Sequence, residues 1–60
     1  MYAFCNVTLL GETVEEVEKK IEPYRKYPFF SNGPIRSTEN APRFKRQGKF
    51  MVIVNFFNND

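Results

Sequence analysis

The side chains that could act as nucleophiles are one cysteine, Cys5, and a few hydroxyls, and the chain supplies no base to activate them. It contains no histidine, whereas a catalytic serine, threonine or cysteine needs an adjacent base. Cys5 lies in an apolar, β-branched run, where a cysteine is typically a small buried hydrophobe. We therefore expect no nucleophilic catalysis.

The carboxylates are no better suited to catalysis or metal binding. Five glutamates lie between positions 12 and 22, at helical spacings that favour ordinary surface pairs, Glu15 with Lys19 and Glu16 with Lys20. One cysteine without histidine cannot build a zinc site, and no calcium-loop or phosphate-loop pattern is present. The sequence predicts a protein that is not an enzyme, with no catalytic, cofactor-binding or metal residues and no cofactor.

Sixty residues form one small domain, which buries only about 60% of the surface that its unfolded chain exposes. A single cysteine cannot form a disulfide within the chain, so a second subunit is the remaining means of support. No apolar stretch is long enough to span a membrane, and the N-terminus lacks the pattern of a signal peptide. We expect a cytoplasmic protein that does not contact membranes.

Charge is distributed unevenly along the chain. Residues 1–22 hold five glutamates against two lysines, a net charge of −3, and residues 23–49 hold seven basic residues against one glutamate, a net charge of +6. Aromatic residues interleave with the basic ones, a composition that suits an anionic partner. We expect Tyr27 and Phe44 to stack on or anchor that partner. The residues predicted to contact it are Arg25, Lys26, Arg36, Arg43, Lys45, Arg46 and Lys49.

The clearest structural signal is a helix over residues 13–22. Thr13 followed by Glu16 is a capping box, and apolar residues recur at Val14, Val17 and Ile21. Pro23 removes a backbone donor, so the helix either stops near Ile21 or kinks and resumes as far as residue 27.

Two β-branched and aromatic runs predict strands at about residues 2–10 and 49–57. Prolines and glycines punctuate the segment between the helix and the second strand, so turns should dominate there. Short edge pairings are expected at Phe29–Phe30 and within residues 34–46, and residues 44–46 are expected to form a hairpin with the last strand. The predicted fold is a single α+β domain over residues 1–60, with an antiparallel or mixed sheet and one main helix.

Both strands carry apolar residues on both faces, whereas one helix can cover only one of them. The aliphatic face of the first strand suits the helix, which leaves Tyr2, Phe4 and Leu10 on the opposite face as a candidate interface. An exposed apolar face of this extent on a small protein indicates a binding surface.

These features predict a small binding protein that uses the open apolar face and the basic segment on a protein partner. We expect it to be a homo-oligomer or to bind a larger protein, as a phage or mobile-element accessory or inhibitor protein would. The alternative is a nucleic-acid-binding protein that uses the basic and aromatic segment 24–50. Residues 46–56 resemble an RNA-recognition strand in their order of basic, glycine and aromatic residues, although the second small residue is missing.

Overall fold

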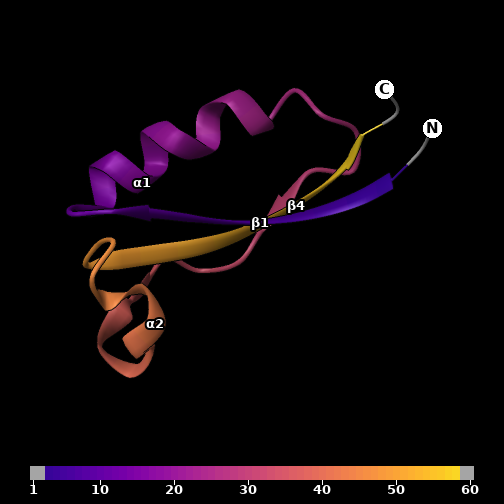
Figure 1. Cartoon of the computed structure of the whole chain (residues 1–60). Coiled ribbons are helices and arrows are strands. Elements are labelled where there is room, and N and C mark those ends of the chain that lie inside the picture. Colours follow the sequence, from indigo (N-terminus) through magenta and orange to yellow (C-terminus); the bar gives the residue numbers. More distant parts are fainter. Residues whose placement is uncertain (1–2, 59–60) are drawn as a thin grey trace.

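The computed structural model of the chain describes residues 3–58, in which a sheet carries one main helix on one of its faces (Figure 1). Tyr2, predicted to be part of the interface, lies outside the described residues. The elements are, in chain order, β1 (Ala3–Gly11), α1 (Val14–Ile21), the 3-10 turn η1 (Glu22–Tyr24), β2 (Ser31–Asn32), β3 (Arg36–Ser37), the 3-10 turn η2 (Thr38–Asn40), α2 (Pro42–Lys45) and β4 (Phe50–Asn58).

The last strand, β4, is the centre of an antiparallel sheet. β1 pairs with it along its whole length, from Ala3 opposite Asn58 to Gly11 opposite Phe50. On its other side β4 pairs with the two short strands β2 and β3. The predicted α+β fold is confirmed, as are both long strands and the short strand expected within residues 34–46.

Helix α1 begins where the capping box places it. The backbone N–H of Glu16 donates to Thr13 Oγ1 at 3.1 Å, and the Glu16 carboxylate accepts from the N–H of Glu12 at 2.7 Å. The first bond satisfies a backbone donor that the first turn of the helix leaves without a partner, and the second ties the residue before the N-cap to that turn. Glu16 therefore contacts the backbone, and the Lys20 ammonium donates to the carbonyl of Leu10, so the predicted Glu16–Lys20 pair does not form.

Replacing Thr13 by alanine is expected to lower the free energy of unfolding by about 1 kcal/mol, because Glu16 N–H loses its acceptor. Chemical denaturation followed by circular dichroism measures the change. Thr13→Ser keeps the hydroxyl and should retain most of the stability. Equal losses in the two variants would show that the hydroxyl is not the stabilising group.

The helix tightens at Pro23 and continues to Tyr24. Pro23 occupies the start of η1, where a missing N–H costs no helical bond. The N–H of Arg25 then donates to the carbonyl of Glu22, and that of Tyr27 to the carbonyl of Tyr24. Of the two alternatives left open by the sequence, the α-helix stops at Ile21, and a single 3-10 turn continues the chain to Tyr24 and not as far as residue 27.

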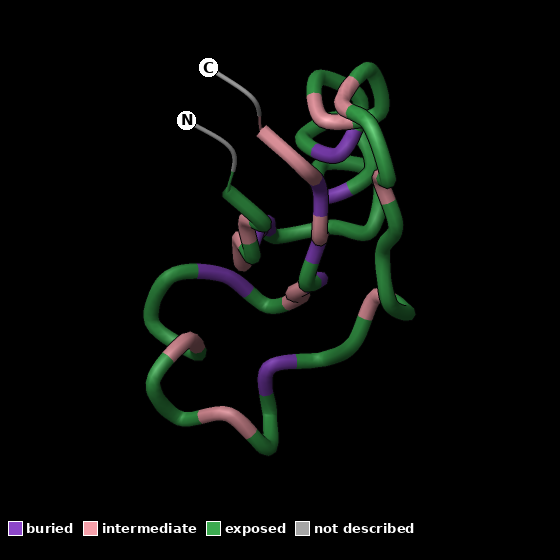
Figure 2. Tube along the Cα trace, turned by 90° about the vertical axis from the view of Figure 1, so that its right-hand side faces the viewer, coloured by how far each residue is buried: buried purple, intermediate pink, exposed green. Residues whose placement is uncertain are grey.

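The core lies between α1 and the face of the sheet that α1 covers. Most of the chain is exposed or half-buried, and the buried positions are few (Figure 2). Tyr24 and Tyr27 close the core at one end, with ring centroids 5.3 and 4.6 Å from that of Phe56. The buried apolar side chains are Leu9, Val17, Ile21, Val52, Val54 and Phe56.

Two expectations for the segment between α1 and β4 are wrong. Phe29 has a positive φ of 56°, which removes Phe29–Phe30 from the sheet, and the pairing falls on Ser31 and Asn32 instead. Residues 44–46 belong to α2 and its C-cap, not to a hairpin. Pro42 begins this helix, because its fixed φ suits the first helical position.

Candidate functional site

The face of the sheet opposite α1 is open, as the pattern of apolar residues predicts. Strand register places alternate side chains of the two long strands on it, since cross-strand partners share a face. Phe4 is 67% exposed and Ile53 is 41% exposed. The open face is made by Phe4, Asn6, Thr8 and Leu10 of β1 and by Met51, Ile53, Asn55 and Phe57 of β4.

Three phenylalanines form an aromatic cluster at the end of the open face nearest the termini. The Phe57 ring lies 6.0 Å from Phe4 and 6.1 Å from Phe29, centroid to centroid, and both pairs are edge-on. Phe29 is 77% exposed. The sequence did not predict Phe29 as a binding residue but as part of a short edge pairing, because no motif marks its positive φ. The aromatic cluster, Phe4, Phe29 and Phe57, offers large apolar rings to a partner.

The middle of the open face is polar. The amide Nδ2 of Asn6 donates to Oδ1 of Asn55 at 2.7 Å. This bond joins cross-strand partners of β1 and β4 and satisfies one donor and one acceptor on the surface. It separates the aromatic cluster from the aliphatic residues at the other end of the face.

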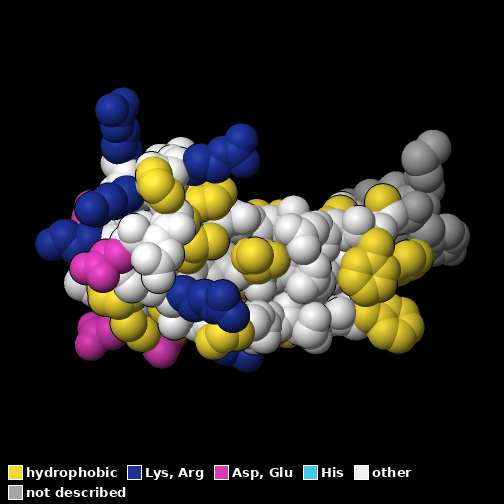
Figure 3. All heavy atoms as spheres, turned by 90° about the horizontal axis from the view of Figure 1, so that it is seen from below, with side chains coloured by type: hydrophobic (Ala, Val, Ile, Leu, Met, Phe, Trp, Pro, Cys, Tyr) yellow, Lys and Arg dark blue, Asp and Glu magenta, His cyan; other side chains and the backbone are white. Residues whose placement is uncertain are grey.

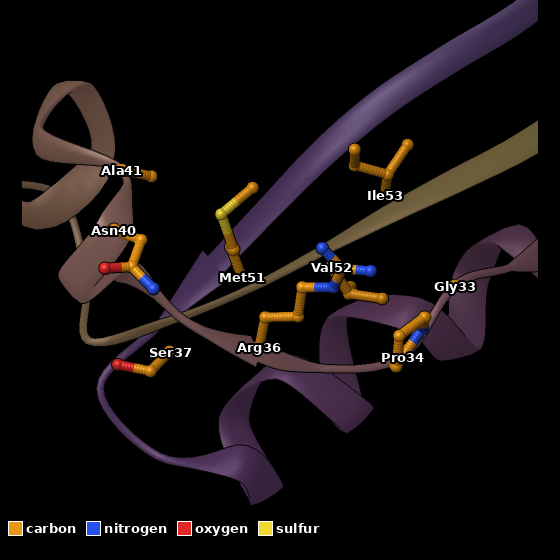
Figure 4. Close-up of a pocket in the computed structure, with 9 residues that line it drawn as sticks. All are labelled: Gly33, Pro34, Arg36, Ser37, Asn40, Ala41, Met51, Val52 and Ile53. Atoms are coloured by element: carbon orange, nitrogen blue, oxygen red, sulfur yellow. The ribbon is translucent and has the colours of Figure 1, made fainter.

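A groove of about 490 Å³ lies at the aliphatic end. Met51 and Ile53 project from β4 on the side away from α1, and Asn40 and Ala41 line the groove from the segment at its Met51 end (Figure 4). Arg36 is the cross-strand partner of Met51, so its guanidinium shares the face with the two apolar side chains. The groove therefore combines an apolar floor with a cation at its edge.

Basic side chains gather next to this groove. Seen from the open face, most Lys and Arg side chains cluster at one end of the molecule, and hydrophobic side chains continue toward the other (Figure 3). α2 and its C-cap supply three of them, and Lys49 comes from the turn that leads into β4. All are exposed. The basic cluster is Arg36, Arg43, Lys45, Arg46 and Lys49.

The other two predicted basic residues lie apart from the basic cluster. Arg25 and Lys26 follow η1, whereas α2 lies at the opposite end of the sheet (Figure 1). Arg25 Nε is 3.3 Å from Oε1 of Glu22, and its guanidinium lies over the Phe30 ring. The seven predicted residues therefore form two groups, of which only the basic cluster adjoins the groove.

The two rings predicted to stack on a partner have different surroundings. Tyr27 is half-buried, with its ring stacked on Phe56 and the Lys26 ammonium over it, so its contacts are within the domain. Phe44 is half-buried in α2, and its carbonyl accepts from the N–H groups of Gln47 and Gly48. Both rings are therefore less accessible than those of Phe4 and Phe29, which are 67% and 77% exposed.

Within residues 3–58 no group of three or more acidic or cysteine side chains is arranged to hold a metal ion. The Cys5 thiol is free and half-buried. Among the same residues, no helix has the length and apolar composition needed to cross a bilayer. Comparison of the chain with protein-family models, curated sequences and solved structures gives no match.

Proposed function

We propose that this chain is a small, non-enzymatic binding protein that docks on a protein partner through the open face and the basic cluster together. The observation that carries the proposal is the face of the sheet opposite α1, on which Phe4 and Ile53 are exposed in the described part of the chain and which five cations border at one end. Protein interfaces combine apolar and aromatic anchors with charged residues, and the open face offers both, with the aromatic cluster at one end and the basic cluster at the other. The partner should present an apolar patch with acidic residues beside it.

On the open face, the distance between the aromatic cluster and the basic cluster favours a protein over a nucleic acid. Single-stranded nucleic acids bind where aromatic rings and cations alternate along one groove, so that bases stack while phosphates are neutralised. Here the aromatic cluster and the basic cluster lie at opposite ends of a molecule 35 Å long, with an amide pair and aliphatic side chains between them. This arrangement suits a broad protein surface.

Reversing the charge of Arg43, Lys45 and Arg46 to glutamate is expected to weaken partner binding at least tenfold without unfolding the domain, because all three are exposed. Ile53→Asp should weaken it as well, since it places a charge on the apolar face. Lys19→Glu, on the exposed side of α1, is the control and should bind as the native chain does.

The measurement is cross-linking of the tagged chain in lysate of the source cells, with quantitative mass spectrometry. A protein retained by the native chain and by Lys19→Glu, and lost with both other variants, supports the proposal. Binding of a single-stranded oligonucleotide at low salt, lost as salt rises, would replace it with the nucleic-acid alternative. Equal recovery of every protein with all variants would show that neither surface takes part.

A further inference from the structure

In the described part of the chain, the outer edge of β1 is a nine-residue strand edge that pairs with no other strand. Within residues 3–58, β1 pairs only with β4, so its other side carries no strand. Ala3–Gly11 contains no charged residue and no proline. Natural proteins usually protect an exposed edge with charges, prolines, bulges or short strands, because its free backbone groups pair readily with another strand.

The opposite edge of the sheet is protected in this way. There β2 and β3 are two residues each, and Pro34 lies between them. The pairing register also shifts by one residue between β2 and β3, which breaks the continuity of the edge. The contrast indicates that the bare edge of β1 has a pairing role that the other edge lacks.

The hydrogen bonds of β4 show which backbone groups of β1 are free. The N–H of Gly33 donates to the carbonyl of Ile53, so the backbone groups of Ile53 point toward β2. Since these groups alternate along an antiparallel strand, Val52 and Val54 point theirs toward β1. Their partners in β1 are odd-numbered, so the outward N–H and C=O groups belong to Phe4, Asn6, Thr8 and Leu10.

We propose that this edge pairs antiparallel with the same edge of a second copy of the chain, about a two-fold axis at Val7. Val7 is the middle residue of β1. Pairing about it sets Phe4 opposite Leu10 and Asn6 opposite Thr8 of the other copy, so that apolar meets apolar and polar meets polar. The edge is self-complementary in this register, as a two-fold interface requires.

The contacts already present at the edge are compatible with this pairing. The Lys20 ammonium donates to the carbonyl of Leu10, and a carbonyl oxygen can accept a second bond from an added strand. In the dimer, the two sheets join through their β1 strands into one continuous sheet, and the open face extends across both copies. The dimer goes beyond the proposed function, because it depends on the free backbone groups of the β1 edge and not on the basic cluster.

The first test is the mass of the native chain in sedimentation equilibrium. We expect twice the 7.1 kDa of one chain. Thr8→Pro removes an outward N–H that β4 does not use, so it should give a folded monomer. Thr8→Val keeps the N–H and should remain a dimer. A native monomer, or a folded Thr8→Pro variant that is still a dimer, would overturn the proposal.

Cysteine cross-linking tests the register. In the proposed pairing Val7 faces Val7 of the other copy in a non-hydrogen-bonded pair, about 4.5 Å apart at Cα, within the span of a disulfide. Cys5→Ala with Val7→Cys should therefore form a covalent dimer on oxidation. Cys5→Ala with Leu9→Cys should not, because residue 9 then faces alanine 5.

A third variant, Leu9→Cys with Cys5 retained, is the positive control for the register. In the proposed dimer, residue 5 of each copy faces residue 9 of the other, so the pair occurs at two places. We expect two disulfides and a covalent dimer. Efficient cross-linking of native Cys5 with itself would place the axis elsewhere and contradict the register. Cross-linking of the Leu9→Cys chain that lacks Cys5 would contradict it as well.

Discussion

Replacing Phe56 by alanine is expected to unfold the domain. Phe56 is 5% exposed and lies under both Tyr24 and Tyr27, at the end of the core where the chain leaves α1. Removing a buried phenylalanine ring costs about 3–5 kcal/mol. A core of this size rarely supplies more than about 3–5 kcal/mol in total. One substitution can therefore remove all of the net stability.

The measurement is thermal and urea unfolding at a fixed chain concentration, followed by circular dichroism. Phe29→Ala is the matched control, because it deletes the same ring from a site that is 77% exposed and should change stability by less than about 0.5 kcal/mol. Phe56→Leu should fall between the two, since it keeps part of the apolar volume. A cooperative transition in Phe56→Ala at the native midpoint would refute the assignment of this residue to the core.

The helix and both long strands could be predicted because their signals are local. A capping box, an apolar stripe at helical spacing and two long β-branched runs each depend on residues close together in the sequence. Alternation also predicted the faces correctly. Cys5, Val7 and Leu9 share the helix-covered face with Phe56, Val54 and Val52, their partners in β4.

The segment between α1 and β4 could not be predicted, because short elements depend on contacts made elsewhere. A hairpin of residues 44–46 with β4 was plausible from Gly48 alone, but Pro42 favours a helical turn, and the carbonyl of Ala41 accepts from the N–H groups of Phe44 and Lys45. Instead, the N–H of Thr38 donates a hydrogen bond to the carbonyl of Lys49, which places η2 beside the start of β4. Pairs of this kind, distant in sequence, leave no local pattern.

The candidate site was predicted in part. Phe4 and Leu10 lie on the open face as expected, since period-two alternation fixes the face of every residue in a strand. The grouping of the cations was not predictable, because α1 and the loop after it carry Arg25 to one end of the sheet and return the chain to place Arg36 beside Met51. Basic residues that lie in one segment of the sequence are therefore not neighbours on the surface of the folded chain.

The edge of β1 and the basic cluster are separate surfaces, so the tests of these two surfaces can be read independently. Thr8→Pro alters the backbone at the edge and leaves the basic cluster intact, whereas the charge reversals in and after α2 leave the edge intact. Loss of the dimer with partner binding retained would show that one copy is the binding unit. Loss of both with Thr8→Pro alone would show that the partner needs the continuous face of two copies.

Gly48→Ala is expected to lower the free energy of unfolding by about 1–3 kcal/mol through steric overlap. A Cβ added at Gly48 would lie 2.9 Å from the N and 3.0 Å from the O of Gly11, which ends β1 just before the cap of α1. These are backbone atoms of a paired strand, so they cannot move aside as a side chain would. The overlap would separate the turn before β4 from the end of β1.

Gly33→Ala is the matched control for this prediction, because no atom lies within 4 Å of a Cβ added there. Neither glycine has a positive φ, so alanine meets no backbone strain at either position, and the overlap with Gly11 arises at Gly48 alone. The buried Thr38 hydroxyl donates to the carbonyl of Gly48 at 2.8 Å, so displacement at Gly48 should also weaken this bond. Faster amide exchange at Gly11 and the start of β4 in Gly48→Ala, with Gly33→Ala unchanged, is the expected result. Equal stability of the two variants would mean that the close approach of Gly48 to Gly11 does not occur.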